Sequence, residues 1–193
     1  HTRYRRSSRG LGDVYKRQEL FCARSEALRL WDALMEQGER HGITPMGAAA
    51  LEVIRIEAGL AAPGAEFGPG HDAWEAGLGF AVDLRKRDFV GKAALERNAR
   101  DPRRQLKGLL LGGNDVPRPG AGVFMHERQV GHITSATRSP TLERGIAMAR
   151  LAVEFTGNDT QLEVGMMDGR MKRLPARVTD FPFVDPKRER ARA

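Results

Sequence analysis

The stretch VFMHERQVGHITSATRSPTLERGIAMARL, residues 123–151, decides the fold of the C-terminal half of this chain. In it, β-type runs alternate apolar with polar residues, and the turn-forming segments HER at 126–128 and SP at 139–140 separate them. The same pattern extends outward over residues 103–186. We expect strands at about 105–111, 121–125, 129–136, 146–151, 160–166 and 173–181. Short strands at this spacing, with turn residues between them, predict a small antiparallel β-barrel.

Residues 19–98 have a different and mainly helical pattern. Ser25 can cap a helix over about 26–40, and a second helix is expected at 46–58, where Pro45 precedes it and Gly59 ends it. Further expected elements are a short helix at 91–98 and strand-like runs at 19–23 and 80–84. Two helices with so few strands do not make a closed sheet. This part is therefore predicted to be an incomplete α/β piece, and the whole chain to be α+β.

The positive charge of the chain is concentrated at its two ends. Residues 1–18 carry +5 and residues 187–193 carry +3 of the formal net charge of +7, which leaves −1 for the rest. We interpret residues 1–18 as a disordered or non-native leader and residues 187–193 as a basic tail. Because the folded part has no net basic character, we expect no nucleic-acid partner.

Several other classes of protein are disfavoured by the sequence. The five histidines show no metal-ligand spacing, Cys22 is the only cysteine, and the sequence has no nucleotide-binding or nucleophile motif. No apolar run approaches the roughly 20 residues that a membrane span needs, and no signal peptide is recognisable. We therefore expect no metal and no membrane association, a cytoplasmic location, and a buried, inert thiol at Cys22.

Three residues are the best candidates for ligand contacts. Arg55 offers a fork of donors to a carboxylate or phosphate, and Glu57 can bind an amide-like edge. Arg138 lies in a run rich in hydroxyl groups, TSATRSPT at 134–141, which suits an anion. Each also has a structural interpretation: Arg55 and Glu57 as a helix C-terminus that Gly59 stops, and residues 134–141 as a polar loop leaving a barrel strand. The sequence leaves both interpretations open.

The two tryptophans are expected to differ in environment. Trp31 lies on the apolar face of its helix, with Leu28 and Leu34, and is expected in a core. Trp74 follows a loop rich in Gly, Pro and Ala and stands near Gly77 and Gly79, where an aromatic ring can remain exposed for stacking.

Ordered motifs over residues 19 to about 190 resemble the aminomethyltransferase family, which contains the glycine cleavage T-protein and the folate domains of dimethylglycine- and sarcosine-oxidising enzymes. The motifs are LWDALMEQGERHGI, RIEAGL, EAGLGFAV, DFVGKAAL, VPRPG, VGHITSATRSPTL and PARVTDFPFVDP. The resemblance covers the C-terminal half of the family only. It implies that residues 19–98 are the C-terminal part of a folate-binding core and residues 103–186 the family's C-terminal barrel.

The resemblance also implies a function for the parent protein. Such an enzyme transfers a one-carbon unit from an aminomethyl donor to tetrahydrofolate, sometimes with a lipoyl carrier protein, the glycine cleavage H-protein, as partner. Arg55, Glu57 and Arg138 would then contact folate. The family's catalytic aspartate belongs to an N-terminal half without a counterpart here, so no catalytic residue is expected in this chain and this fragment alone is expected to be inactive.

One departure keeps alternatives open. Ala50-Leu51-Glu52 stands where the T-protein has an alanine-arginine-aspartate step. This resembles the amine-demethylating relatives, in which a fused flavin domain is the partner. A folate-binding domain of such an enzyme and a non-catalytic folate-binding module are therefore the alternatives.

Overall fold

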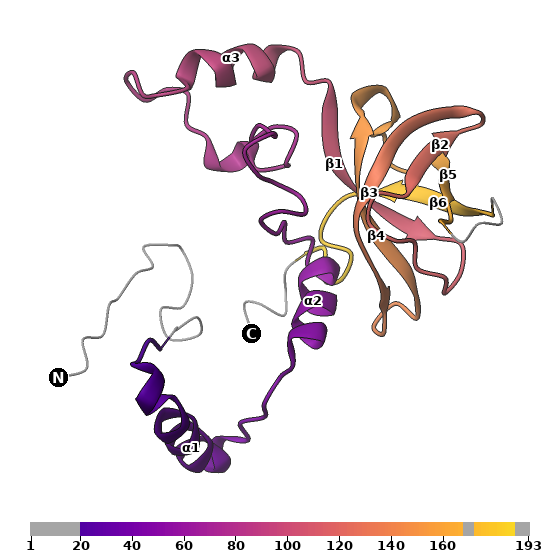
Figure 1. Cartoon of the computed structure of the whole chain (residues 1–193). Coiled ribbons are helices and arrows are strands. Elements are labelled where there is room, and N and C mark those ends of the chain that lie inside the picture. The colour runs from indigo at the N-terminus through magenta and orange to yellow at the C-terminus, as the bar shows by residue number, and fades with distance from the viewer. Residues whose placement is uncertain (1–19, 168–171, 188–193) are drawn as a thin grey trace. The chain divides into compact units, whose positions relative to one another are not determined.

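A computed structural model describes residues 20–167 and 172–187 of the chain (Figure 1). The chain divides into two compact units, residues 1–46 and 47–193, and each is described by itself. The predicted leader at 1–18, and all of the predicted basic tail except Lys187, lie outside the described residues.

The second unit contains a closed antiparallel β-barrel. Its strands are β1 (Arg104–Leu111), β2 (Gly122–Met125), β3 (Arg128–Ser139), β4 (Arg144–Ala152), β5 (Gln161–Gly165) and β6 (Arg173–Thr179). They follow one another around the barrel in the order β1-β4-β3-β2-β5-β6, and β6 pairs with β1 to close it. The predicted barrel is confirmed, and each expected run corresponds to a strand. A short 3-10 helix, η4 (Val153–Phe155), follows β4.

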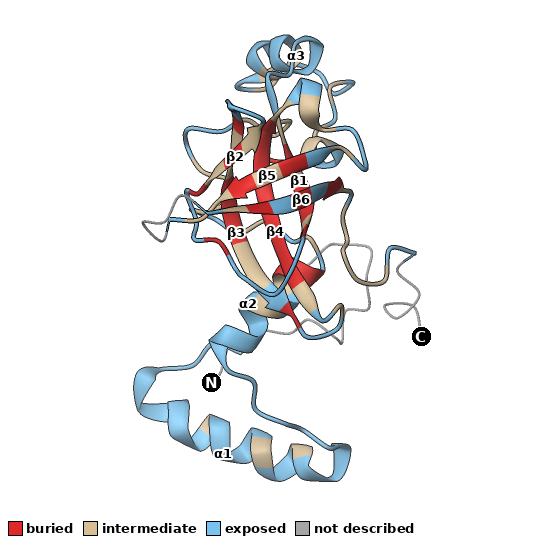
Figure 2. Ribbon diagram, turned by 90° about the vertical axis from the view of Figure 1, so that its right-hand side faces the viewer, coloured by how far each residue is buried: buried red, intermediate tan, exposed pale blue. Residues whose placement is uncertain are grey.

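The interior of the barrel is a continuous apolar core. Side chains that alternate along the strands meet there, as the period of two residues requires. Among them are Leu109, Val123, Ile133, Leu151 and Val164, all of which are buried. In Figure 2 the buried colour lies mainly on the strands, where it alternates with the other two. The barrel therefore has a complete core of its own.

Strand β4 is buried on both of its faces. Ala147, Ala149 and Leu151 point into the barrel. Ile146 and Met148 belong to a second cluster on the outside, together with Ile56 of the helix α2 and Leu106 of β1. This outer layer joins α2 to the barrel wall, and Phe181 and Phe183 near the C-terminus pack against it.

Helix α2 (Ala48–Glu57) ends in a motif that its sequence explains. Gly59 adopts the left-handed conformation, with φ +65°. The amide of Leu60 donates to the carbonyl of Arg55 at 2.8 Å, and the amide of Gly59 donates to the carbonyl of Ile56 at 2.9 Å. This pair of bonds is the Schellman arrangement, which glycine favours because it has no Cβ. The helix therefore stops where the sequence predicted, immediately outside the barrel.

The segment after α2 differs from the prediction at one point. Residues 80–84 form no strand: the 3-10 helix η3 (Gly79–Ala81) occupies the start of this run, and a turn follows it. The ring of Trp74 lies against Gly79, where a Cβ would be only 2.3 Å from its Cε3 atom. Since no described strand pairs with residues 80–84, the alternation of apolar residues there has no sheet to join. Helix α3 (Lys92–Arg100) then follows, close to the expected 91–98.

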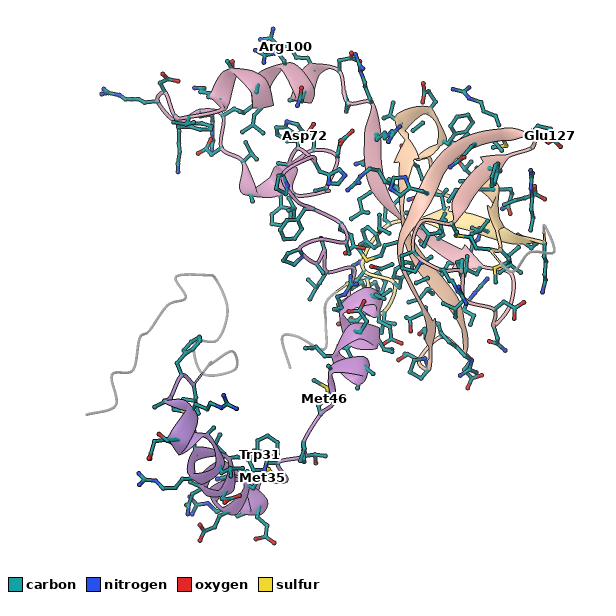
Figure 3. The ribbon with its side chains drawn as sticks, in the orientation of Figure 1. Trp31, Met35, Met46, Asp72, Arg100 and Glu127 are labelled. Carbon is teal, nitrogen blue, oxygen red and sulfur yellow. The ribbon has the colours of Figure 1, made fainter. Side chains whose placement is uncertain are left out.

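The first unit is helical and exposes its apolar side chains. It contains η1 (Arg24–Glu26), α1 (Ala27–Gly38) and η2 (Glu39–His41). Trp31 and Met35 lie on one side of α1 (Figure 3). The expectation of a buried Trp31 is wrong, because 52% of its surface is exposed. Residues 20–23 form no strand, and Cys22 is exposed rather than buried. Over the described residues, no helix is both long and apolar enough to cross a membrane.

Candidate functional site

Arg55 stands at the end of α2 with its guanidinium against the barrel wall. Its Nη1 donates to Glu66 at 3.0 Å and to the Leu60 carbonyl at 3.3 Å. Its Nε and Nη2 both bond to Glu52, and Nη2 also donates to the Ser135 hydroxyl at 2.7 Å. A guanidinium has five N–H donors, and these contacts engage all of them. The hydrogen bonds to Glu52 hold the pKa of Arg55 above its ordinary value.

Glu66 is the centre of this cluster and was not identified from the sequence. Its side chain is fully buried, and besides Arg55 it accepts hydrogen bonds from the Ser135 hydroxyl at 2.6 Å and the Ala62 amide at 2.9 Å. A buried carboxylate requires such partners, because removing an unpaired charge from water is very costly. The only sequence signal was an acidic residue within a loop otherwise rich in Gly, Pro and Ala. Its side-chain partners, Arg55 and Ser135, are 11 and 69 positions away, beyond any local pattern.

Glu57 joins α2 to two other parts of the unit. Its carboxylate accepts a hydrogen bond from the Ser139 hydroxyl and another from the Thr141 hydroxyl at 3.2 Å. Its backbone carbonyl accepts from the amides of Phe183 at 2.9 Å and Val184 at 3.2 Å. Helix α2, the β3–β4 connection and the C-terminal segment therefore meet at this one residue.

Arg138 does not join the other two predicted residues. It is exposed, and its Nε donates to the amide oxygen of Asn114 at 3.3 Å. The hydroxyl-rich run around it is not a loop: residues 134–139 lie within β3, which extends to Ser139 because Arg138 and Ser139 pair with Gly145 and Arg144 of β4. The structure brings Arg55 and Glu57 to the same wall, where Ser135 and Ser139 of β3 serve as their partners.

A buried arginine, Arg150, lies on the outer side of β4. Arg150 is 2% exposed, and its Nη2 donates to the backbone carbonyl of Glu66. Its Nε has no hydrogen-bond partner among the described residues. Burial lowers the pKa of Arg150. His132, opposite it on β3, has a pKa below 6.5, first because it is buried and then because Arg150 and Arg104 lie nearby.

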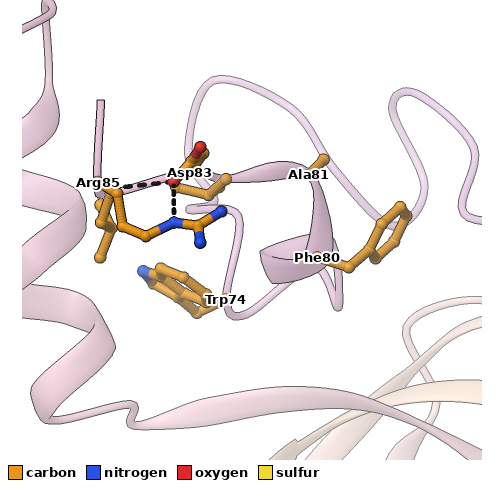
Figure 4. A pocket seen from close by; sticks show the side chains of 7 residues that line it. Trp74, Phe80, Ala81, Asp83 and Arg85 are labelled. Carbon is orange, nitrogen blue, oxygen red and sulfur yellow. Dashed lines mark hydrogen bonds and ion pairs between the residues drawn. The ribbon is translucent and has the colours of Figure 1, made fainter. Parts of the chain in front are cut away.

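Two adjoining hollows lie over the segment that follows α2. One, of about 360 Å³, is lined by residues 80–85 and by Trp74 (Figure 4). The other, of about 410 Å³, is lined by Trp74, Phe80 and Arg104 among others. Ligand sites usually measure about 300–1,000 Å³. Trp74 is half-buried, and its indole nitrogen donates to the Leu95 carbonyl at 2.9 Å. Phe80 points away from Trp74 in Figure 4 and is 88% exposed.

The residues that line the hollows offer two kinds of binding contact. The hollows present aromatic surface. Arg104 lines the second, and Arg85 lines the first, where it is paired with Asp83 at 3.1 Å. Aromatic faces suit a planar ring, and an exposed arginine suits a carboxylate. No group of three or more His, Cys, Asp or Glu side chains within residues 20–167 and 172–187 is arranged to hold a metal ion.

Comparison with known proteins relates both parts of the chain to one group. The family model described as the glycine cleavage T-protein C-terminal barrel domain matches residues 104–185, and the model of the GCVT N-terminal domain matches residues 18–86. A Ruegeria pomeroyi protein named trimethylamine-oxide aldolase is 42% identical over 177 residues, which are 91% of this chain and 22% of that protein. An aminomethyltransferase of a Geobacillus species is 38% identical over 167 residues, 86% of this chain and 45% of that protein.

A solved structure agrees with this relationship. The crystal structure of the glycine cleavage system aminomethyltransferase T from Bartonella henselae matches 84% of this chain and 45% of its own, with a TM-score of 0.75 and 26% identity. The chain thus spans less than half the length of these relatives. The paired family matches and the shared barrel establish that the chain belongs to the aminomethyltransferase family, of which it represents the C-terminal part.

Proposed function

We propose that this chain forms one wall of the folate site of an aminomethyltransferase, which transfers a one-carbon unit from an aminomethyl donor to tetrahydrofolate. The observation that carries the proposal is the 38% identity to an aminomethyltransferase over 86% of the chain. Catalysis in such an enzyme consists mainly of orienting the two reactants and stabilising developing charge. Because the chain spans 45% of that relative, we assign no catalytic residue to it.

The residues of the hollows suit a folate. The pterin and the aminobenzoyl ring of a folate are planar, and its glutamyl tail carries carboxylates. We propose that Trp74 and Phe80 provide stacking surface for a ring, and that Arg104 pairs with the tail, because Asp83 already pairs with Arg85. Aromatic stacking and a charge-assisted hydrogen bond supply the two kinds of contact that such a molecule requires.

The predicted contacts of Arg55, Glu57 and Arg138 with folate stay predictions. The guanidinium of Arg55 is already engaged by Glu52, Glu66 and Ser135. We propose that Arg55 and Glu57 act chiefly by fixing α2 and the loop after it against the barrel, which holds the wall of the site in place. Arg138, being exposed, remains available to an anionic tail. The division into a folate-core part at 19–98 and a barrel at 103–186 belongs to this proposal.

A second candidate is favoured by a specific observation. The Ruegeria pomeroyi relative, at 42% identity, carries the name trimethylamine-oxide aldolase, and this chain matches only 22% of it. The chain would then be the folate-binding domain of a larger enzyme that acts on a methylated amine. If the chain belongs to such an amine-demethylating enzyme, its partner would be a fused domain, such as a flavin domain. If it belongs to an aminomethyltransferase, its partner would be a lipoyl carrier protein. For either one we propose a cytoplasmic setting, consistent with the exposed free thiol of Cys22.

The two tryptophans allow a direct test. Trp31→Phe leaves Trp74 as the single fluorophore, and Trp74→Phe leaves Trp31. We expect 5-formyltetrahydrofolate to quench the fluorescence of Trp31→Phe saturably. The fluorescence of Trp74→Phe should fall only as far as light absorption by the ligand explains, and free tryptophan measures that loss. Equal quenching of the two variants, or none of the Trp74 signal at saturating folate, would refute a site at the hollows.

A further inference from the structure

Arg150 is a charged side chain on the outer surface of the barrel, and yet only 2% of it is exposed. Its neighbours on β4, Ala149 and Leu151, point into the barrel interior, so Arg150 points outward. A charged side chain on the outside of a barrel becomes buried only where another segment covers it. Its Nη2 donates to the backbone carbonyl of Glu66, so the covering segment is the one after α2. This segment, residues 66–75, is called the Trp74 loop.

The two ends of the Trp74 loop meet the barrel at neighbouring positions. The first end is attached through the Glu66 carbonyl, which accepts from Arg150. At the second end, the amide of Leu106 donates to the Glu75 carbonyl at 2.9 Å. Leu106 of β1 is the residue that pairs with Arg150 of β4 in the sheet. The loop therefore closes over Arg150, and Trp74 directly precedes the point of closure.

The guanidinium of Arg150 acts on both of these ends. Burial lowers its pKa, and the charge that opposes this shift most is that of Glu75. Its Nη2 binds the Glu66 carbonyl, whereas its Nε is buried without a hydrogen-bond partner among the described residues. A buried donor without a partner costs stability. Since the apolar core of the barrel is complete without Arg150, this side chain adds little to the barrel itself.

We propose that Arg150 is a positioning residue for Trp74, because it holds the two ends of the Trp74 loop together and so fixes the wall of both hollows. One side chain supplies the bond to the Glu66 carbonyl and the attraction to Glu75, and its removal releases both. The side chain of Glu66 is held separately by Arg55, so the loop should loosen mainly toward Trp74. The consequence for a folate rests on the proposed function, whereas the closure of the loop is measurable without any ligand.

The test uses Trp74 as the only tryptophan, in the full chain carrying Trp31→Phe. Arg150→Met keeps an apolar stem in the same space but removes the charge and all donors. We expect the acrylamide quenching constant of Trp74, measured without ligand, to rise about twofold or more, because a loosened loop exposes its side chains to solvent. Arg150→Lys keeps the charge toward Glu75 and should restore most of the original value. A loss of packing alone would affect the two variants equally.

Arg144→Met is the matched control. Arg144 lies at the opposite end of β4, and its guanidinium also donates to a backbone carbonyl, that of Leu111, at 3.2 and 2.6 Å. Its replacement should leave the quenching of Trp74 unchanged. Circular dichroism verifies that each variant is folded. If Arg150→Met is not, Glu75→Gln, which removes the attraction at the second end of the loop, takes its place with the same expected rise.

A second measurement connects the positioning role to ligand binding. 5-Formyltetrahydrofolate, titrated against the fluorescence of Trp74, should bind about tenfold more weakly to Arg150→Met, since a loop that must be ordered on binding lowers the affinity. If the chain carrying only Trp31→Phe binds no folate, the proposed function fails, and the ligand-free quenching still decides the role of Arg150. That role is overturned if quenching is unchanged in the folded variant, if Arg144→Met raises it as much, or if Arg150→Lys restores nothing.

Discussion

The guanidinium of Arg55 and the carboxylate of Glu66 lie 3.0 Å apart, and the Glu66 side chain is fully buried. Ser135 of β3 bonds to both, donating to Glu66 at 2.6 Å and accepting from Arg55 at 2.7 Å. These three residues connect the end of α2, the loop after it and the barrel wall. The position of the segment that carries Trp74 therefore depends on a buried polar cluster.

Removing the Glu66 charge should destabilise this unit strongly. Glu66→Gln leaves the Arg55 side chain, which is 12% exposed, without its buried counter-ion. The expected loss is about 3 kcal/mol in the free energy of unfolding, as for other broken buried pairs. Glu52→Gln removes the second carboxylate that pairs with Arg55. Because the Glu52 side chain is 54% exposed, the loss in the free energy of unfolding should be less than about 1 kcal/mol. Urea denaturation followed by circular dichroism measures both, and equal losses would contradict the assignment.

Two glycines provide a matched pair for the close contact after α2. Gly59 and Gly64 both have positive φ, +65° and +81°, so alanine at either should cost about 1–2 kcal/mol in backbone strain. At Gly59 a Cβ would also lie 2.5 Å from the Cβ of Phe181, whereas at Gly64 it meets nothing within 4 Å. Because overpacking adds about 1–3 kcal/mol, Gly59→Ala should lower the free energy of unfolding clearly more than Gly64→Ala. Similar values in urea denaturation would show that Phe181 does not pack there.

The hydroxyl of Ser139 should matter far more than that of Thr137. Ser139 is buried, donates to Glu57 and accepts from the Leu142 amide at 3.0 Å. Ser139→Ala leaves these groups without a partner, and the expected loss is about 1–3 kcal/mol. Among the described residues, the Thr137 hydroxyl bonds to the Arg138 carbonyl alone, at 3.5 Å, and Thr137→Ala should be within about 0.5 kcal/mol of wild type. Thermal denaturation ranks the two, and a reversed order would argue against the role of Glu57 as a junction.

Stability should fall on mild acidification because of His132. Its pKa in the folded protein is below 6.5, owing to burial and to the nearby charges of Arg150, Arg104 and His71. The unfolded chain then binds a proton that the folded chain excludes, so this contribution is present above about pH 6.5 and is lost as the pH falls through the folded pKa. We expect a lower melting temperature at pH 5.5 than at pH 7.5, and a smaller difference in His132→Gln.

The control for this pH effect is a histidine in the other unit. His41→Gln, at an exposed position, should leave the difference between the two pH values unchanged. The carboxylates with a shifted pKa do not titrate in this window, because the pKa values of Glu52, Asp83 and Asp180 are all lowered, first by hydrogen bonds from Arg55, Arg85 and Lys107 respectively. A drop of equal size in His132→Gln and in wild type would contradict the assignment.

The barrel was predictable because its signals are local. The alternation of apolar and polar residues and the turn residues located each strand, and Gly59 marked the end of α2. Both signals depend only on residues that are neighbours in the sequence. Residues 80–84 show the limit of such reasoning. Their alternation fits a strand, but a strand needs a partner, and none of the described strands pairs with them.

The site was predictable only in part, because its partners are distant in sequence. Arg55, Glu57 and the hydroxyl-rich run of β3 stood out as residues. The hydrogen bond from Ser135 to Glu66 joins residues 69 positions apart, and the bond from Ser139 to Glu57 joins residues 82 positions apart. Glu66 and Arg150 gave no signal of their own, since only the folded wall buries them.

Calorimetry on the full chain tests the central proposal most directly. Tetrahydrofolate is titrated into the purified chain, whose folding is verified beforehand by circular dichroism. We expect saturable 1:1 binding that Trp74→Ala weakens about tenfold, the loss expected when one stacking contact worth about 1–3 kcal/mol is removed. A folded chain that releases no binding heat with any reduced folate would contradict the proposal.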